Sequence, residues 1–563
     1  MIARRMGRLI RPVPWMLLLA AGTAWLGTAV PGRAQTAEAP TSLEERIELL
    51  EQQNQALRAA MDAQQSAAAM DPASVRHLVA EILREEQPRL EAKQAQPGNL
   101  GDPPKAAPAP AGYEVGSDSR LNAAWNNGLT FQSAQKDWNI HFGGRMQFEP
   151  VFWSQPTDLK GPAPGNGGIP ASNPGDGVGA LDDGMFFRRV RLRADGTAYE
   201  LVEFVMEIDF EQLNLITYDH MWVGVKDLPL LGTLRVGQHK IPQGLEMMGS
   251  DYHLTFLERS SLSDAFWTLF GLGVFAGNTL FDEHATWQAM FHRIQPTGFF
   301  NADFGDGDYA WTGRFTYLPY YAHEGRCLVH LGGSYQWRHG DLGRTIVPGG
   351  TGNAYADTQS DVRFRARPEL RDATGVTFPF GDSARFVDTG FLMAESVQTV
   401  SPELLLILGP FSLQSEAAWA YAKNVRSIYP AAAFNVPRGS PMFWGGYVQA
   451  SYFLTGEHRG YDRRFGTFDR PRVIENAFLT RDKDGGWLWG RGAWEVGYRF
   501  SYLDLNDDGI NGGQLRQHTL GLNWYLNDNF KMQFNYLNIH RNVIEPAVSG
   551  TVHGFGILSQ WYF

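Results

Sequence analysis

Residues 493–502 read AWEVGYRFSY, and their side chains alternate between two kinds. The apolar or aromatic members are Trp494, Val496, Tyr498, Phe500 and Tyr502, and the small or polar members are Glu495, Gly497, Arg499 and Ser501. Successive side chains of a β-strand point to opposite faces of the sheet. The stretch therefore predicts a strand with one apolar, aromatic face and one polar face.

The same alternation recurs along the chain. It is found in NIHFGGRMQF (139–148), EFVMEIDF (203–210) and NFKMQFNY (529–536). A packed protein core would not accept the charged face of these strands. A transmembrane β-barrel would, because its outer face contacts lipid and its inner face contacts water. A soluble β-sandwich also alternates, but it turns its apolar face inward.

Strand length and aromatic placement favour the barrel over the sandwich. Many alternating stretches reach ten residues or more, and aromatic residues gather at their ends, as in YLPYY (317–321) and SYFLTGE (451–457). Transmembrane strands of about 9–11 residues flanked by aromatic girdles are typical of outer-membrane barrels. The last strand, HGFGILSQWYF (553–563), ends in Phe563 and resembles the signal that the bacterial outer-membrane insertion machinery reads. We therefore predict an all-β fold, a transmembrane antiparallel barrel.

The turns give a strand count. Periplasmic turns of such barrels are short and outer loops are long. Short turns are predicted at YLNDNF (525–530), LGPFSL (408–413), DLPLLGT (227–233) and ADGTAYE (194–200), an outer loop at 503–513 and a long outer loop at 340–396. The segments then pair as about sixteen strands. The stretch 456–488 is an exception. Strand parity places it on the periplasmic side, although it is much longer than a periplasmic turn.

Residues 1–34 have the features of a signal peptide. A positive start (MIARRMGRLIRP) precedes an apolar run, and Gly32 and Ala34 stand at the small-residue positions before Gln35. A membrane-anchor helix is the alternative. The longest later apolar run, LLLILGPF (404–411), is too short for a membrane helix. The protein is therefore expected to be exported and to enter a membrane only as strands.

Residues 35–95 predict a periplasmic helical segment that precedes the barrel domain, 138–563. Apolar residues step alternately by four and three, with Asn54 in an a-type position. They are Leu43, Ile47, Leu50, Leu57 and Met61. A short coiled coil is favoured, and an isolated amphipathic helix is the alternative. Residues 96–137 form a linker, rich in Pro, Ala and Gly, and a lead-in to the barrel.

Composition and motifs argue against several other classes of function. The net charge of -11 disfavours a nucleic-acid partner, and the single cysteine, Cys327, excludes an intrachain disulfide and a cysteine-cluster metal site. No catalytic triad, metal-ligand cluster or phosphate-binding glycine loop is evident, so we expect no enzyme and no cofactor. Residues 504–513, DLNDDGINGG, resemble a calcium loop, but Leu515 stands where a bidentate Glu belongs. A solvated loop is favoured.

Positive charge is concentrated in FRRVRLRADG (187–196). Arg189, Arg191 and Arg193 share one strand face. We expect that face to line the lumen, because a cation facing lipid costs about 2–4 kcal/mol at the membrane centre. Arg188 falls on the other face, near the strand end, where it can snorkel. The same parity turns five more arginines inward: Arg145, Arg235, Arg314, Arg338 and Arg499.

Guanidinium groups bind oxyanions in a bidentate manner, so this ladder is a candidate anion path. The alternative is that acids on the same inner faces neutralise the arginines and leave a charge-balanced general pore. Those acids are Glu149, Glu203, Glu207, Asp209 and Glu495.

Several ordered motifs resemble the phosphate-selective porin O and P family over about 138–563. They include HFGGRMQFEPVFW (141–153), GPFSLQSEAAW (409–419) and GGYVQASYFLTGEHRGYD (445–462). The resemblance implies a sixteen-stranded outer-membrane barrel, usually trimeric, whose third outer loop folds inward and narrows the pore. That loop follows GQHKIP (237–242) and covers roughly 243–268.

Lys240 and Arg259 match basic positions of the family around this loop. The loop also carries four acids, without an evident lysine cluster: Glu246, Asp251, Glu258 and Asp264. The resemblance therefore leaves the solute open between phosphate or polyphosphate, other anions and small solutes generally.

These observations predict a passive outer-membrane porin with its N-terminal helix in the periplasm. The expected partners are membrane lipid, small anions, two further copies of the chain in a homotrimer, and the assembly machinery through Phe563. A structural barrel that tethers the outer membrane to peptidoglycan through its coiled coil is the main alternative class. A soluble β-rich lectin is a third.

Overall fold

The structure is a computed structural model that describes residues 113–161, 177–211, 216–294, 309–340, 362–371, 384–427, 436–481, 485–544 and 547–563. The chain divides into two units, Met1–Lys105 and Ala106–Phe563, and the described residues belong to the second. The expected signal peptide (1–34) and coiled coil (35–95) lie outside the described residues. In the part that is described, no helix is both long enough and apolar enough to span a membrane.

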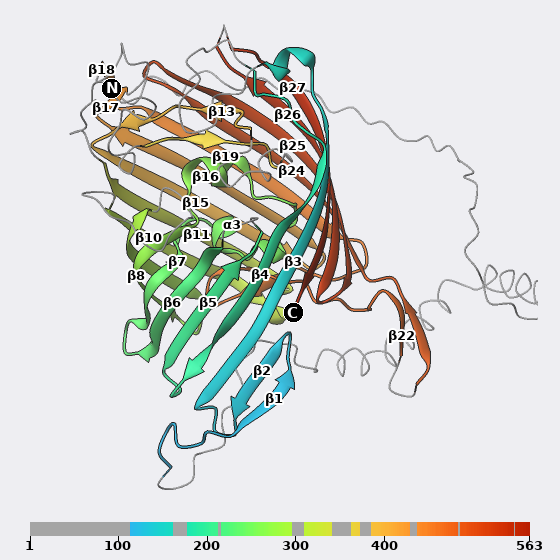
Figure 1. Cartoon of the computed structure of the whole chain (residues 1–563). Coiled ribbons are helices and arrows are strands. Elements are labelled where there is room, and N and C mark those ends of the chain that lie inside the picture. Colours follow the sequence, from blue (N-terminus) through green and yellow to red (C-terminus); the bar gives the residue numbers. More distant parts are fainter. Residues whose placement is uncertain are drawn as a thin grey trace, which may run out of the picture. The chain divides into compact units, whose positions relative to one another are not determined.

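The second unit is a closed antiparallel barrel (Figure 1). Its sheet has 18 strands, and without the hairpin β1–β2 sixteen remain, which confirms the predicted number. The first eight barrel strands are β3 (Trp138–Ser154), β4 (Gly184–Ala198), β5 (Val202–Asp209), β6 (Thr217–Leu228), β7 (Gly232–Lys240), β8 (Phe270–Leu280), β9 (Ala285–Ile294) and β10 (Tyr309–Ala322). The others are β11 (Cys327–His339), β15 (Ser396–Leu408), β16 (Phe411–Lys423), β19 (Met442–Phe453), β24 (Ala493–Asp507), β25 (Ile510–Asn527), β26 (Phe530–Asn542) and β27 (Gly550–Tyr562).

The barrel closes between its first and last strands. β27 pairs with β3 from His553 opposite Ser154 to Tyr562 opposite Arg145. Before that point β3 pairs with β2 (Leu129–Ser133), which forms a hairpin with β1 (Leu121–Trp125). The ring of Phe563 stacks on Trp125 with 5.9 Å between centroids. The hairpin thus continues the wall below the seam, within the segment expected to be a linker and lead-in.

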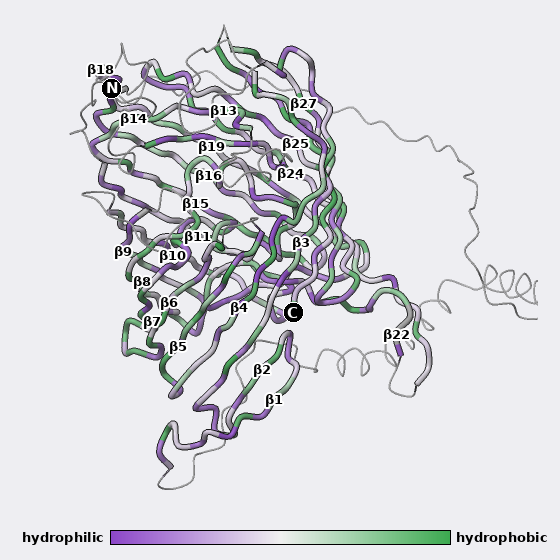
Figure 2. Tube along the Cα trace, viewed as in Figure 1, coloured by the Kyte–Doolittle hydropathy of each residue, from purple (hydrophilic) through white to green (hydrophobic). Residues whose placement is uncertain are grey.

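The predicted alternation matches the two faces of the barrel wall. On β24, Tyr498 is 43% exposed, whereas its neighbour Arg499 is 1% exposed. Apolar and polar residues alternate along the strands in the same way (Figure 2). Outward residues can face lipid because the closed sheet satisfies every backbone group internally.

The connection between β7 and β8, residues 241–269, lies inside the barrel, and we call it the inner loop. It contains α3 (Leu245–Met248), the 3-10 turn η2 (Asp251–His253) and α4 (Ser261–Phe266). Lys531 of β26 donates to the carbonyl oxygens of Tyr252 and Leu254, at 2.8 and 3.1 Å. Because Lys531 points inward, these contacts hold the inner loop against the wall formed by the last strands.

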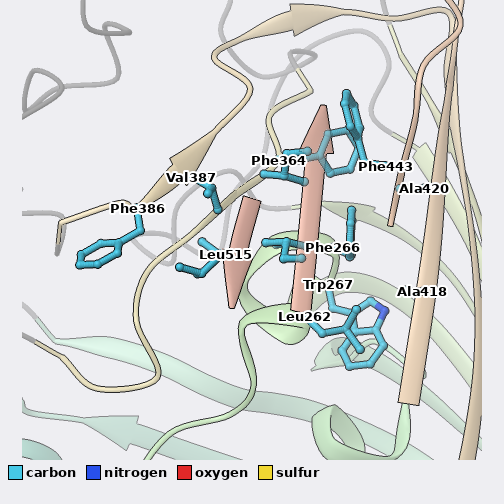
Figure 3. Packing of buried hydrophobic residues seen from close by; sticks show 14 of the residues in the cluster. Leu262, Phe266, Trp267, Phe364, Phe386, Val387, Ala418, Ala420, Phe443 and Leu515 are labelled. Carbon is cyan, nitrogen blue, oxygen red and sulfur yellow. The ribbon is translucent and has the colours of Figure 1, made fainter. Parts of the chain in front are cut away.

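A second inserted segment, formed by residues 362–371 and 384–395, packs against the inner loop. The long outer connection between β11 and β15 contributes β12 (Arg365–Ala366), β13 (Val387–Asp388) and β14 (Leu392–Met393). Its apolar side chains, Phe364 and Phe386 among them, join α4 and inward residues of the wall in one buried cluster (Figure 3). The wall residues include Ala418, Ala420, Phe443 and Leu515. We expected a polar, wet inner face, and this part of it is instead a dry core, because the inserted segment needs apolar partners.

The long periplasmic connection between β19 and β24 divides into two hairpins. β20 (Gly460–Asp462) and β21 (Thr467–Asp469) turn into the barrel, where Phe468 is buried against Leu245 and Leu254 of the inner loop. β22 (Phe478–Arg481) and β23 (Trp487–Gly490) form the second hairpin. The connection lies at the barrel end where β27 terminates, as strand parity predicted.

The remaining elements are short. They are the 3-10 turns η1 (Thr157–Lys160) and η3 (His323–Gly325), and the outer strands β17 (Val425–Ser427) and β18 (Val436–Gly439).

Candidate functional site

The candidate site is the inside of the barrel, where β4 contributes the arginines of the predicted ladder. Arg189, Arg191 and Arg193 all contact carboxylates. Arg189 Nε lies 2.7 Å from Asp251 of the inner loop, and Arg193 Nε lies 2.8 Å from Asp195. Arg191 pairs with Asp209 and Asp219, and its Nη1 lies 3.3 Å from Glu207. The arginines thus point inward, but each of them is paired.

The prediction that Arg188 would snorkel on the lipid face is wrong. It is buried, and its guanidinium binds Glu258 of the inner loop. The register between β3 and β4 shifts here, from Gln147 opposite Arg189 to Phe148 opposite Phe187. A β-bulge places one extra residue in a strand and breaks the alternation. Arg188 is that residue, so consecutive arginines both reach the interior.

Arg145 lies opposite Arg191 on the neighbouring strand. Its guanidinium contacts Asp251, and it lies 2.5 Å from Glu207. Like charges on adjacent strands repel, and the two shared carboxylates between them offset that repulsion. Asp251 therefore joins the inner loop to both β3 and β4.

Three further predicted arginines are also buried in ion pairs. Arg235 lies 2.7 Å from Glu203, and Arg314 lies 2.9 Å from Glu403. Arg499 Nε donates to Glu369 at 2.7 Å, and Arg499 Nη1 lies 3.2 Å from Glu246. Burial of a charge is costly, and a hydrogen-bonded partner of opposite sign offsets that cost.

These pairs also connect separate parts of the molecule. Arg314 Nη2 donates to the carbonyl oxygen of Gly466 at 2.7 Å, so β10 holds the inserted hairpin β20–β21. Arg499 joins β24 to Glu246 of the inner loop and to Glu369 of the second inserted segment. These arginines therefore fasten inserted segments to the wall.

Lys240 and Arg259 differ from the others, because backbone carbonyl groups hold them. Lys240 Nζ donates to the oxygen of Gly249 at 2.8 Å, and Arg259 Nη2 donates to the same oxygen at 3.0 Å. Arg259 Nε also donates to the oxygen of Glu246, at 3.1 Å. In the described part of the chain, neither side chain forms an ion pair with a carboxylate. Two cations thus converge on one neutral oxygen at the inner loop.

The sequence analysis did not find the arginines of the second inserted segment. Arg367 lies 3.0 Å from Asp264 of α4, and Arg363 pairs with Asp388. Arg371 lies 3.9 Å from Glu258. The alternation in VRFRARPELR (362–371) could have indicated a charged strand face, but nothing in the sequence indicated that the connection between β11 and β15 enters the barrel.

The candidate calcium loop is a tight turn at Asp508–Gly509 between β24 and β25. The carboxylate of Asp504 accepts from the amide of Gln514 at 2.7 Å and from that of Asn506 at 3.1 Å. Across the described ranges, no group of three or more His, Cys, Asp or Glu side chains is arranged to hold a metal ion.

A closed, even-stranded antiparallel barrel with an apolar outer face and inserted loops defines a transmembrane β-barrel of the outer-membrane type. The chain matches the family described as phosphate-selective porin O and P over residues 176–563, and it belongs to that family. The family and the fold place the protein in the bacterial outer membrane.

Two relatives align over most of the chain. An uncharacterized protein of Caulobacter vibrioides is 27% identical over 442 residues, which cover 77% of this chain and 73% of the relative. Porin O of Pseudomonas aeruginosa is 24% identical over 434 residues, which cover 73% of this chain and 85% of that porin.

Solved outer-membrane proteins are also similar at low identity. OmpF of Salmonella typhi has a TM-score of 0.41 and 9% identity, covering 78% of this chain and all 100% of that chain. The channel DcaP of Acinetobacter baumannii has a TM-score of 0.40 and 12% identity, covering 76% and 97%. OmpT of Vibrio cholerae, in its trimer form, has a TM-score of 0.40 and 10% identity, covering 75% and 99%.

Proposed function

We propose that the protein is a porin for the passive diffusion of small anions, phosphate among them, with its selective constriction at Lys240 and Arg259. The observation that carries this proposal is the convergence of both cations on the oxygen of Gly249. A carbonyl oxygen orients a cation without cancelling its charge. The inner loop thereby presents positive charge to a solute, which attracts anions and repels cations.

The inner loop supplies the narrowing in this proposal. It extends from β7 across the barrel interior to Lys531 of β26, and the inserted hairpin β20–β21 contacts it from the periplasmic end. A solute therefore passes between the inner loop and the adjacent wall. The ladder arginines have a different role here. Arg189 and Arg191 hold the inner loop through Asp251, whereas Arg193 pairs with acids of the wall.

A general porin without charge preference is the second candidate. The pairing of lumenal arginines with carboxylates favours this candidate, because acids balance the positive charges. The paired arginines are Arg145, Arg189, Arg191 and Arg193. The two candidates differ in one measurable property. An anion porin sets up a reversal potential of defined sign across a salt gradient, and a charge-balanced pore of similar width does not.

The test uses the double variant Lys240→Gln, Arg259→Gln in planar bilayers with a low-salt KCl gradient. The reversal potential should shift toward that of a cation-selective pore, because the only change at the constriction is the loss of two charges. Lys423→Gln is the matched control, since Lys423 lies at the outer end of β16, in an exposed pair with Glu395. An unchanged potential in the double variant would support the general porin instead.

We further propose that three copies of the chain assemble through the outer face of β4–β8. Their exposed outward residues near mid-strand are aliphatic: Leu192, Met206, Val223, Val236 and Val274. The outer face of β10–β26 is instead rich in exposed aromatic residues such as Trp311, Trp419 and Trp444. Tryptophan and tyrosine are enriched where a protein meets the membrane interface, so we assign the aromatic outer face of β10–β26 to lipid and the aliphatic outer face of β4–β8 to the protomer contact.

The N-terminal part completes the proposal. Residues 1–34 direct export, and 35–95 form a coiled coil in the periplasm, because β3 begins at the end where β27 terminates. Phe563 is offered to the assembly machinery before the barrel closes. Attachment to peptidoglycan through 35–95 is compatible with a working pore.

A further inference from the structure

The hairpin β22–β23 exposes apolar side chains on both of its faces. Its strands pair from Phe478 opposite Gly490 to Arg481 opposite Trp487. Trp487 is 62% exposed, Leu488 51% and Trp489 70%. Alternation places the two tryptophans on one face and Leu488 on the other. An isolated two-stranded hairpin is marginally stable in water, so this one needs an apolar environment.

The base of the hairpin is fixed to the lipid-facing side of the wall. The ring of Phe478 contacts Trp524 of β25 at 5.4 Å, and Trp524 stacks on Trp494 of β24 at 5.1 Å. The indole nitrogens of Trp494 and Trp524 both donate to the oxygen of Arg491, at 3.2 and 2.8 Å. These tryptophans lie near the periplasmic ends of their strands and point outward. The hairpin thus begins within an aromatic belt.

The hairpin then stands clear of the wall, at the barrel end that also carries β1 and β2 (Figure 1). Ala477 donates its backbone N–H to the oxygen of Leu526 at 2.7 Å, which anchors the start of β22 to the end of β25. The inserted hairpin β20–β21 precedes it in the same connection. The connection between β19 and β24 therefore places one hairpin inside the barrel and one outside it.

We propose that β22–β23 inserts into the interfacial layer of the periplasmic leaflet, with phospholipid as its partner. A folded protein partner would cover one face of the hairpin, whereas the interfacial layer surrounds both. Tryptophan prefers this layer, where its ring meets acyl chains and its N–H meets water and headgroups. Arg481 lies over the Trp487 ring at 4.8 Å, so its guanidinium can reach headgroup phosphate. The inference is independent of which solute the pore passes.

The test places a polarity-sensitive NBD probe on the hairpin of the full-length protein in phosphatidylcholine vesicles. Cys327→Ser removes the only cysteine, and Leu488→Cys then carries the probe. Nitroxide lipids labelled at the headgroup or at two acyl depths act as quenchers. Leu520→Cys, an outward residue of β25, is the lipid-facing control, and Asp158→Cys, on an outer loop, is the water-facing control.

The probe at 488 should show blue-shifted emission and be quenched by shallow nitroxides at least about twofold more than the probe at 158. The probe at 520 should respond most to the deep nitroxide. Trp489→Cys, on the opposite face, should be quenched by shallow lipids as well. A conductance like that of the unlabelled protein shows that each labelled barrel is folded.

Two results would overturn the proposal. Access of aqueous iodide to the probe at 488, without quenching by lipid, would place the hairpin in water. Protection from both iodide and nitroxide lipids would show that protein covers it, in which case a second copy or a periplasmic partner replaces lipid as the occupant.

Discussion

At the scale of single residues, the ion pairs decide which arginines contribute to stability and which to the field in the pore. Arg191 is surrounded by four carboxylates, those of Glu207, Asp209, Asp219 and Asp251. Arg193 has a side chain that is 38% exposed and pairs with Asp195 and Glu207. Water screens an exposed pair, whereas removal of one partner from a buried pair leaves an uncompensated charge.

Arg191→Gln and Arg193→Gln should therefore differ in stability although both lose one lumenal charge. We expect Arg191→Gln to lose about 3 kcal/mol of stability, because buried acids lose their counter-ion. Arg193→Gln should lose less than about 1 kcal/mol. The measurement is the temperature at which the folded barrel unfolds in detergent, followed by its change in electrophoretic mobility. Equal losses would mean that the ladder is solvated along its whole length.

At the scale of elements, an apolar core inside the barrel holds the second inserted segment in place. The barrel wall can close without this core. Phe364 packs between Phe266 of α4, at 5.7 Å, and Phe443 of β19, at 5.1 Å. Phe364→Ala should cost about 3–5 kcal/mol of local packing and release the segment from the interior. Single-channel conductance should rise while the barrel still closes. Phe315→Ala, an outward residue of β10, removes the same ring from the lipid face and should leave the conductance unchanged. An unchanged conductance in both variants would mean that the segment does not obstruct the path.

The inserted hairpin β20–β21 carries an acid that responds to pH. Burial, and then the charge of Asp469, raises the pKa of Asp462 from 3.8 to about 6. A raised folded-state pKa means that the docked hairpin binds the proton more tightly than the released one. Its docking is therefore strongest below about pH 4 and weakens as pH rises through about 6.

Hydrogen exchange at residues 460–469, corrected for intrinsic rates, should show greater protection at pH 4.5 than at pH 7.5. Asp462→Asn should keep high protection at both pH values, because it cannot ionise. If the wild-type protein shows equal protection at both, Asp462 is ionised in the docked hairpin throughout that range.

At the scale of the whole molecule, the sequence predicted the wall well and the interior poorly. Alternation in stretches such as 493–502 identified both faces, because the lipid outside and the polar groups inside constrain every second residue. The β-bulge at Arg188 was not predicted, because one extra residue in a strand does not change the local composition. Lys240 and Arg259 were proposed from the family resemblance. The backbone carbonyl groups that hold them and the dry core around Phe364 were not found, because both depend on where long loops fold back.

The outer face of β4–β8 is aliphatic and that of β10–β26 is aromatic, and this difference gives a test of how three copies of the chain assemble. Val236 on β7 is 54% exposed and Leu520 on β25 is 53% exposed, and both point outward from mid-strand. A tryptophan at either position is acceptable to lipid, so Val236→Trp and Leu520→Trp should both fold. At a close contact between protomers, however, the larger ring overpacks the interface at a cost of about 1–3 kcal/mol. Val236→Trp should therefore lower the trimer fraction in native mass spectrometry while Leu520→Trp leaves it unchanged. The reverse outcome would assign the protomer contact to the aromatic wall, and it would turn the aliphatic face of β4–β8 toward lipid.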